Sequence, residues 1–79
     1  MPPVELNLRG LKCPLPALKT RKALLRLSSG GVLVVECTDP LAALDIPSLL
    51  HETGDRLEEQ SERDGILLFR IRKTETPSR

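Results

Sequence analysis

Aromatic side chains are almost absent from this sequence of 79 residues: Phe69 is the only one, and there is neither Trp nor Tyr. A hydrophobic core built from this chain must therefore be aliphatic. Surfaces that bind single-stranded nucleic acid stack bases on aromatic side chains, which are scarce here. The net charge is only +1, from 12 basic and 11 acidic residues, so strong attraction to phosphate is not expected. The sequence predicts no direct nucleic-acid partner.

Long hydrophobic runs are also missing. The longest uninterrupted apolar stretches have four residues, whereas a membrane-spanning helix needs about 20. Met1-Pro2-Pro3 does not lead into the apolar segment that is typical of a signal peptide. We therefore expect no membrane partner and a location in the cytoplasm, where thiols are kept reduced.

Cysteine and histidine are few: the chain has Cys13, Cys37 and a single histidine, His51. Two cysteines are too few for a disulfide scaffold, and the three residues lack the clustered spacing of a zinc site. The sequence therefore predicts neither a metal site nor a cofactor. His51 alone near a helix end is interpreted as a solvent-facing or capping residue.

The first half of the chain has the pattern of a strand, a helix and a second strand. Apolar and polar residues alternate from Val4 to Arg9, and Gly10 ends this strand. Pro14 suits the first position of a helix, which should end at Ser28-Ser29-Gly30-Gly31. Val32–Cys37 is β-branched and apolar, as in a buried strand. A strand–helix–strand unit of this kind favours a right-handed parallel crossover.

The expected faces of the first helix follow from its leucines and its basic residues. An apolar stripe is predicted from Leu15, Leu18 and Leu25, helped by Leu24 and Leu27. The opposite side carries Lys19, Arg21, Lys22 and Arg26. That basic side is interpreted either as a solvated face or as a docking surface for an acidic protein.

The second half begins with two helix-start signals. Asp39-Pro40 should open a helical segment through Leu44, and Asp45-Ile46-Pro47 repeats the signal. Because a proline inside a helix costs about 3 kcal/mol, a short turn is expected between the two segments. The second segment should run to His51 or Thr53 and stop at Gly54.

Two strands and a tight turn complete the chain. Arg56–Arg63 is polar and suits an edge strand, where the Glu58, Glu59 and Glu62 charges discourage unwanted pairing. Asp64-Gly65 predicts a two-residue hairpin turn. Ile66–Arg72 is the last strand, with Leu67, Phe69 and Ile71 on one face.

These elements predict a β-α-β-α-β-β chain, an α/β two-layer sandwich with both helices on one face of a mixed four-stranded sheet. Residues 1–73 should form a single domain, and 74–79 a polar, disordered tail. The uncovered sheet face would carry Val32, Val34 and Leu68 among charges.

The chemistry of the chain is concentrated at Cys13. Helix N-termini favour anions, so Cys13 is predicted to have a lowered pKa, in the range of roughly 3.5–7.5 found for activated cysteines. Lys12 and Arg9 should add positive charge, and Pro14 and Pro16 should stiffen the first turn. The turn after the first strand would place this thiol exposed at the carboxyl edge of the sheet.

Other polar residues have simpler interpretations. Asp39 and Asp45 are explained as helix caps. Cys37, which alternates with Leu33 and Val35, is predicted to be a core residue. A resolving thiol that forms a reversible disulfide with Cys13 is the alternative for Cys37, and it requires Cα atoms within about 7 Å.

The run Leu11-Lys12-Cys13-Pro14-Leu15-Pro16 after a strand, followed by Asp39-Pro40, Asp45-Ile46-Pro47 and Gly54, resembles the TusA/SirA family of small sulfur-carrier proteins. The likeness covers residues 4 to 73. It implies a fold like the C-terminal domain of translation initiation factor 3. It also implies that Cys13 is the catalytic residue of a sulfurtransferase and carries sulfane sulfur as a persulfide.

The resemblance also implies the partners. The sulfur donor would be a cysteine desulfurase or a rhodanese-like protein, and the acceptor a DsrE-like or similar protein. The acceptor would serve tRNA thiolation, molybdenum-cofactor synthesis or sulfur oxidation. Leu49 and Asp55 depart from the family's common residues, which bears on partner choice. A non-catalytic regulatory or interaction module and a Cys13/Cys37 thiol-redox protein are the alternatives.

Overall fold

The computed structural model describes residues 3–74, which form six elements. Apart from Thr74, the tail predicted for 74–79 lies outside the described residues. In chain order the elements are β1 (Val4–Leu8), α1 (Leu15–Leu25), β2 (Val32–Cys37), α2 (Ala42–Thr53), β3 (Arg56–Arg63) and β4 (Ile66–Arg72). This β-α-β-α-β-β order confirms the predicted one. Neither helix of the described part is long and apolar enough to span a membrane.

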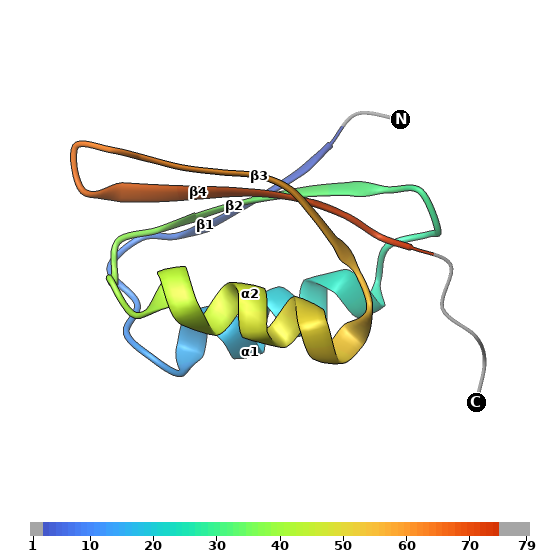
Figure 1. Ribbon diagram of the computed structural model, residues 1–79, viewed down its shortest axis with the longest axis horizontal. Coiled ribbons are helices and arrows are strands. Elements are labelled where there is room, and N and C mark those ends of the chain that lie inside the picture. The colour runs from blue at the N-terminus through green and yellow to red at the C-terminus, as the bar shows by residue number, and fades with distance from the viewer. Residues whose placement is uncertain (1–2, 75–79) are drawn as a thin grey trace.

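The four strands form one mixed sheet in the order β1-β2-β4-β3, and both helices lie on the same side of it (Figure 1). β1 and β2 are parallel, with Leu8 paired to Cys37. β4 is antiparallel to both β2 and β3. The right-handed crossover expected between parallel strands needs a connecting helix, which α1 supplies. The α/β two-layer class predicted from the sequence is therefore correct.

The hairpin between β3 and β4 has the predicted turn. Asp64 and Gly65 both have positive φ, 53° and 78°, as a two-residue type I′ turn requires. β3 is an edge strand, and its residue Glu58 lies at a register shift in the pairing with β4. The Glu58 carboxylate pairs with Arg70 and Arg72 of β4. The charged side chains of β3 thus have two roles: Glu58 forms ion pairs with the neighbouring strand β4, and charges on the edge strand discourage unwanted pairing.

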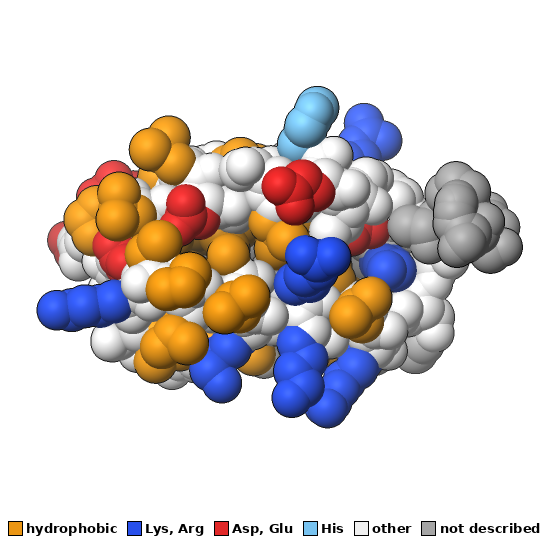
Figure 2. Space-filling model, turned by 90° about the horizontal axis from the view of Figure 1, so that it is seen from below, with side chains coloured by type: hydrophobic (Ala, Val, Ile, Leu, Met, Phe, Trp, Pro, Cys, Tyr) orange, Lys and Arg blue, Asp and Glu red, His pale blue; other side chains and the backbone are white. Residues whose placement is uncertain are grey.

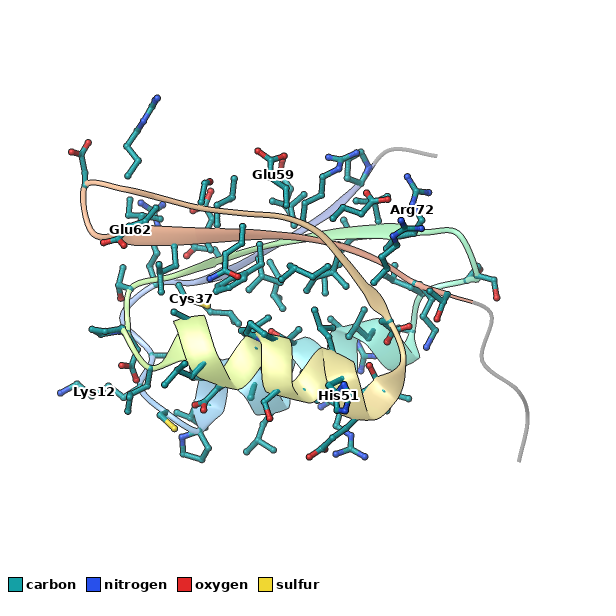
Figure 3. All side chains as sticks on the ribbon, viewed as in Figure 1. Lys12, Cys37, His51, Glu59, Glu62 and Arg72 are labelled. Carbon is teal, nitrogen blue, oxygen red and sulfur yellow. The ribbon has the colours of Figure 1, made fainter. Side chains whose placement is uncertain are left out.

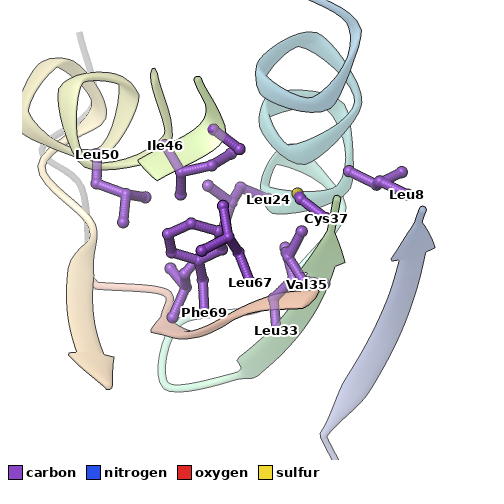
Figure 4. Packing of buried hydrophobic residues seen from close by; sticks show 11 residues of the cluster. Leu8, Leu24, Leu33, Val35, Cys37, Ile46, Leu50, Leu67 and Phe69 are labelled. Atoms are coloured by element: carbon purple, nitrogen blue, oxygen red, sulfur yellow. The ribbon is translucent and has the colours of Figure 1, made fainter. Parts of the chain in front are cut away.

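The core fills the space between the sheet and the two helices (Figure 4). Its residues in β2 and β4 alternate with half-buried ones, and Phe69 lies fully buried among aliphatic side chains. Leu24 of α1 and Ile46 and Leu50 of α2 cover the sheet from the other side. Cys37 belongs to this cluster and is fully buried, which confirms its interpretation as a core residue.

The buried face of α1 differs from the predicted one. Of the predicted apolar stripe, Leu24 is buried and Leu27 packs against the core, whereas Leu15, Leu18 and Leu25 are exposed. Pro16 and Thr20 complete the buried side of the helix. At about 100° per residue, positions 16, 20 and 24 share a narrow stripe, and positions 15, 18 and 25 lie on the other side. The prediction was therefore right for Leu24 and Leu27 and wrong for Leu15, Leu18 and Leu25, because this helix has leucine on both sides.

The predicted break in α2 is absent. One helix runs from Ala42 to Thr53 with Pro47 inside it, and Gly54 ends it with a left-handed φ of 83°. Asp39 lies in the turn before the helix, where its carboxylate accepts the N–H of Leu41 at 3.1 Å. Pro47 leaves only the Ala43 carbonyl without its intrahelical donor. Ile46, Leu49 and Leu50, which are buried on both sides of this proline, keep the helix continuous.

Candidate functional site

The site lies where the loops after β1 and β2 meet at the carboxyl edge of the sheet. The two strands end together, since Leu8 and Cys37 are paired. The Gly10 N–H donates to the Thr38 hydroxyl at 2.9 Å, which links the two loops directly. Because β1 and β2 are parallel, the residues that follow them approach each other even though they are far apart in the chain. This arrangement agrees with the prediction that the turn after the first strand lies at the carboxyl edge of the sheet.

Cys13 occupies the loop immediately before α1, and its side chain is exposed. The helix begins one residue later than predicted: Pro14 is the N-cap, and Pro16 occupies the second helical position. The peptide bond between Cys13 and Pro14 is cis. Cys13 therefore lies one residue before the N-cap rather than at the cap or first helical position that the sequence predicts.

Two carboxylates bind Cys13, one from the turn before α2 and one from the first turn of that helix. The backbone N–H of Cys13 donates to Asp39 Oδ2 at 2.6 Å. The Cys13 thiol, Sγ–H, donates to Asp45 Oδ2 at 2.8 Å. One residue of the first loop is thus held at both its backbone and its side chain by the second loop and by the helix that follows it.

These contacts overturn the predicted acidity of the thiol. The hydrogen bond to Asp45 raises the pKa of Cys13 above its ordinary value, and desolvation and the negative charges of Asp45 and Asp39 act in the same direction. Each of these effects favours the neutral thiol over the thiolate. The prediction of a lowered pKa is therefore wrong, and the resting form of Cys13 in this protein is the thiol.

The helix N-terminus does not reverse this effect because few of its amides are free. Pro14 and Pro16 have no N–H to donate, and the Leu15 N–H is bound to the Lys12 carbonyl at 2.8 Å. Within residues 3–74, no backbone N–H donates to Cys13 Sγ. The prolines that were expected to aim amide dipoles at the sulfur instead remove two of the donors.

The two predicted basic neighbours have different roles. The Lys12 side chain projects away from the loop before α1 (Figure 3). Its charge helps to lower the pKa of Asp39, after the larger effects of the N–H groups of Cys13 and Leu41. Arg9 forms an ion pair with Glu36 at 3.4 Å and donates its Nε–H to Asn7. Neither cation therefore contacts the sulfur.

Cys13 lies at one end of a shallow groove between α1 and α2, with a volume of about 280 Å³. Seen from the helix side, exposed hydrophobic side chains gather on this face, and basic side chains line one of its margins (Figure 2). The large hydrophobic residues exposed on the two helices and the turn before α2 are Leu15, Leu18, Leu25, Leu41 and Leu44. The residues lining the groove are Cys13, Pro14, Ala17, Leu18, Arg21, Asp45, Ser48, Leu49 and Glu52.

The remaining candidates lie away from this groove. Cys37 projects into the space between the sheet and the helices, and His51 lies on α2 toward its C-terminal end (Figure 3). Burial raises the pKa of the Cys37 thiol to about 11, so it is a poor resolving thiol. His51 is exposed, as predicted. In the described part of the chain, no three His, Cys, Asp or Glu side chains are grouped to hold a metal ion.

Asp45 is the residue that sequence reasoning missed. It was interpreted as a helix cap. The N-cap is Leu41, however, and Asp45 lies inside the first turn of α2, which begins at Ala42. Its contact with Cys13 joins residues 32 positions apart. The signal in the sequence was the presence of a second aspartate beyond the one needed to begin the helix.

Comparisons with known proteins agree on one family. A family model described as "Sulfurtransferase TusA" matches residues 4–73. The "Sulfur carrier protein TusA" of Allochromatium vinosum is 43% identical over 70 residues, which cover 89% of this chain and 92% of the relative. The protein of the same name from Pseudomonas putida is 38% identical over 72 residues, 91% and 90% of the two chains.

A solved structure is similar as well. The crystal structure of a SirA-like protein from Desulfitobacterium hafniense matches with a TM-score of 0.80 and 26% sequence identity. The match covers 91% of this chain and 99% of that protein. The fold and the sequence therefore point to the same group of proteins.

Proposed function

Because this chain belongs to the TusA sulfurtransferase family of sulfur carriers, we propose that it accepts sulfane sulfur as a persulfide on Cys13 and passes it to an acceptor protein. The observation that supports this assignment is the exposure of one thiol. Of the two cysteines, Cys13 is exposed and Cys37 is buried. Only an exposed thiol can reach a sulfur atom held by another protein.

The loading reaction is a thiol–disulfide type of exchange. The Cys13 sulfur loses its proton, and its electron pair attacks the terminal sulfur of a donor persulfide, R–S–SH. The donor S–S bond breaks, and its electron pair stays on the donor sulfur, which takes up a proton. The products are Cys13–S–SH and R–SH. One S–S bond is exchanged for another, so no oxidant or reductant is consumed.

The protonated resting state sets a condition on this reaction. Thiolates, not thiols, are the nucleophiles, and the carboxylates of Asp39 and Asp45 disfavour the thiolate of Cys13. We therefore place the activation of Cys13 in the complex with the donor, where groups of the donor compete with these carboxylates. This requirement would limit loading to partners that fit the groove between α1 and α2.

A sulfur carrier works between protein partners. We propose a cysteine desulfurase or a rhodanese-like protein as the donor and a DsrE-like or similar protein as the acceptor, in the cytoplasm. The acceptor would serve tRNA thiolation, molybdenum-cofactor synthesis or sulfur oxidation. The exposed leucines beside Cys13 and the basic side chains of α1 supply apolar area and charge for such contacts.

Intact-mass measurement tests the proposal directly. Wild-type protein incubated with a cysteine desulfurase and cysteine should gain one sulfur atom, which a reductant removes. Cys13→Ser should gain none. Cys37→Ala is the matched control, because it also removes one thiol, and it should load as the wild type does once circular dichroism shows that it is folded.

Equal loading of Cys13→Ser and wild type would refute the assignment. The alternatives make different predictions. If the protein is a non-catalytic regulatory module, the wild type should gain no sulfur, and the Cys13→Ala variant should bind its partners as the wild type does. A Cys13/Cys37 redox protein would lose both free thiols after mild oxidation, and Cys37→Ala would abolish that loss.

A further inference from the structure

We propose that Asp45 is a further functional residue of the sulfur site: its carboxylate holds the unloaded Cys13 side chain in the groove and releases it once Cys13 carries sulfane sulfur. This inference rests on the proposed function of Cys13. It assigns to Asp45 a direct effect on the reacting atom, since Asp45 Oδ2 accepts the thiol proton at 2.8 Å.

The position of Asp45 is not explained by helix capping. The N-cap position of α2 is Leu41, four residues before Asp45, and in the turn before it Asp39 Oδ1 accepts the Leu41 N–H. The backbone N–H of Asp45 donates to the Leu41 carbonyl at 2.9 Å as an ordinary helical residue. Within residues 3–74, the Asp45 carboxylate forms no ion pair. Its one side-chain hydrogen bond in that part of the chain is the bond to Cys13.

Among the charged groups around the Cys13 sulfur, the two carboxylates have the strongest effect on its protonation. Asp39 and Asp45 approach Cys13 from the α2 side. Lys12 precedes Cys13 in its own loop, and Arg21 of α1 and Glu52 of α2 line the same groove. The hydrogen bond to Asp45 is the largest influence on the Cys13 thiol, and it stabilises the protonated form.

Loading removes the group on which this hydrogen bond depends. In the persulfide, Sγ is bonded to Cβ and to the sulfane sulfur, so it has no proton to donate to Asp45. The terminal sulfur lies one S–S bond farther out, about 2.05 Å from Sγ. Any negative charge on that sulfur is repelled by both Asp45 and Asp39. The same carboxylate therefore retains the thiol and repels the loaded form.

This behaviour suits a carrier that must meet two different partners. The unloaded thiol stays protonated and reacts slowly with small oxidants and alkylating agents. The persulfide leaves the carboxylates and turns its outer sulfur toward the solvent, where an acceptor can reach it. Asp45 thus distinguishes the empty state of the protein from the loaded state.

The pH profile of alkylation tests this role. Iodoacetamide should label Cys13 of Asp45→Asn with a lower titration midpoint than Cys13 of the wild type, because the asparagine amide can donate to a thiolate. The thiolate fraction near neutral pH should rise about tenfold for each pH unit by which the midpoint falls. The labelling rate should rise by less than that, because a thiolate of lower pKa is less nucleophilic. Glu52→Gln is the matched control: it removes a carboxylate from the same groove, 7 positions along the same helix from Asp45, and should keep the wild-type midpoint.

An unchanged or higher midpoint in Asp45→Asn would overturn the inference, and so would an equal fall in Glu52→Gln, which would show a general field instead of a hydrogen bond. Should Asp45→Asn fail to fold, wild-type protein decides the question. Peptide mapping should show a higher Cys13 midpoint in the native protein than in urea, and equal midpoints would overturn the inference. The sulfur-loading assay with Cys13→Ser tests the proposed function separately, so failure of one is distinguishable from failure of the other.

Discussion

Asp39 joins Cys13 to the start of α2 with both of its carboxylate oxygens. Oδ2 accepts the Cys13 N–H at 2.6 Å, and Oδ1 accepts the Leu41 N–H at 3.1 Å. These two N–H groups lower the pKa of Asp39, that of Cys13 having the larger effect. A single side chain therefore fixes the backbone of the sulfur loop and begins the helix that carries Asp45.

We expect Asp39→Asn to destabilise the protein more at neutral pH than in acid. The folded state lowers the pKa of Asp39 below its unfolded value, so its contribution to stability is present above that unfolded value and is lost as the pH falls through the folded one. Urea unfolding near pH 7 and at about pH 3 measures the difference. Asparagine has one carboxamide oxygen in place of the two carboxylate oxygens, so it can accept only one of the two N–H groups in the same way.

Asp64→Asn is the control for that experiment. It removes one carboxylate at the hairpin turn, where Asp64 has a positive φ of 53° that asparagine tolerates equally well. Within residues 3–74, no backbone N–H donates to the Asp64 carboxylate, so the stability of this variant relative to the wild type should change less between the two pH values. An equal change for the two variants would contradict the proposed role of the charged hydrogen bonds of Asp39.

At the site, the sequence predicted the features that depend on neighbouring residues and missed those that depend on long-range contacts. Strand alternation, the Asp64-Gly65 turn and the exposed position of Cys13 are local signals, and the structure agrees with them. The lowered pKa of Cys13 was predicted from its own helix and from the positive charges of Lys12 and Arg9 close to it in the sequence. The groups that control it arrive from 26 and 32 positions away, and no local pattern reports which helix will lie beside the thiol.

The error in α1 has a different physical origin. Leu24 and Leu25 are neighbours of the same type, so residue type alone cannot say which one is buried. The side of α1 that packs against the sheet carries Pro16 and Thr20. Their short side chains allow the helix to lie close to the sheet. The predicted leucine stripe instead lies partly over the groove, where Leu18 is one of the lining residues.

This pair of leucines provides a second prediction. Leu24→Ala should lower the free energy of unfolding by about 2–5 kcal/mol, because Leu24 is 1% exposed and its loss leaves a cavity. Leu25→Ala should change it by less than about 0.5 kcal/mol, because Leu25 is 73% exposed. Urea unfolding of both variants under one condition makes the comparison, since helix, residue type and replacement are the same. Equal losses, or a greater loss for Leu25→Ala, would contradict the observed face of α1.

Cys37 gives a third prediction, on alkaline stability. Burial raises its pKa from 9.0 to about 11, so its contribution to stability is complete below about pH 9 and is lost as the pH rises toward 11. Above pH 9 the unfolded chain ionises this thiol while the folded core keeps it neutral, which favours unfolding. The gap between the two pKa values corresponds to about 3 kcal/mol.

Urea unfolding of Cys13→Ala and of the Cys13→Ala/Cys37→Ala double variant, at about pH 8 and at about pH 10.5, isolates the Cys37 contribution. The double variant should be less stable at the lower pH, since it loses the packing of a fully buried side chain. The difference between the two proteins should shrink at the higher pH, because only the protein that retains Cys37 loses stability to thiol ionisation. A difference that stays constant would mean that Cys37 ionises as easily in the core as in the unfolded chain. That result would conflict with its position between the sheet and α1, and it would make the resolving-thiol interpretation of Cys37 worth restoring.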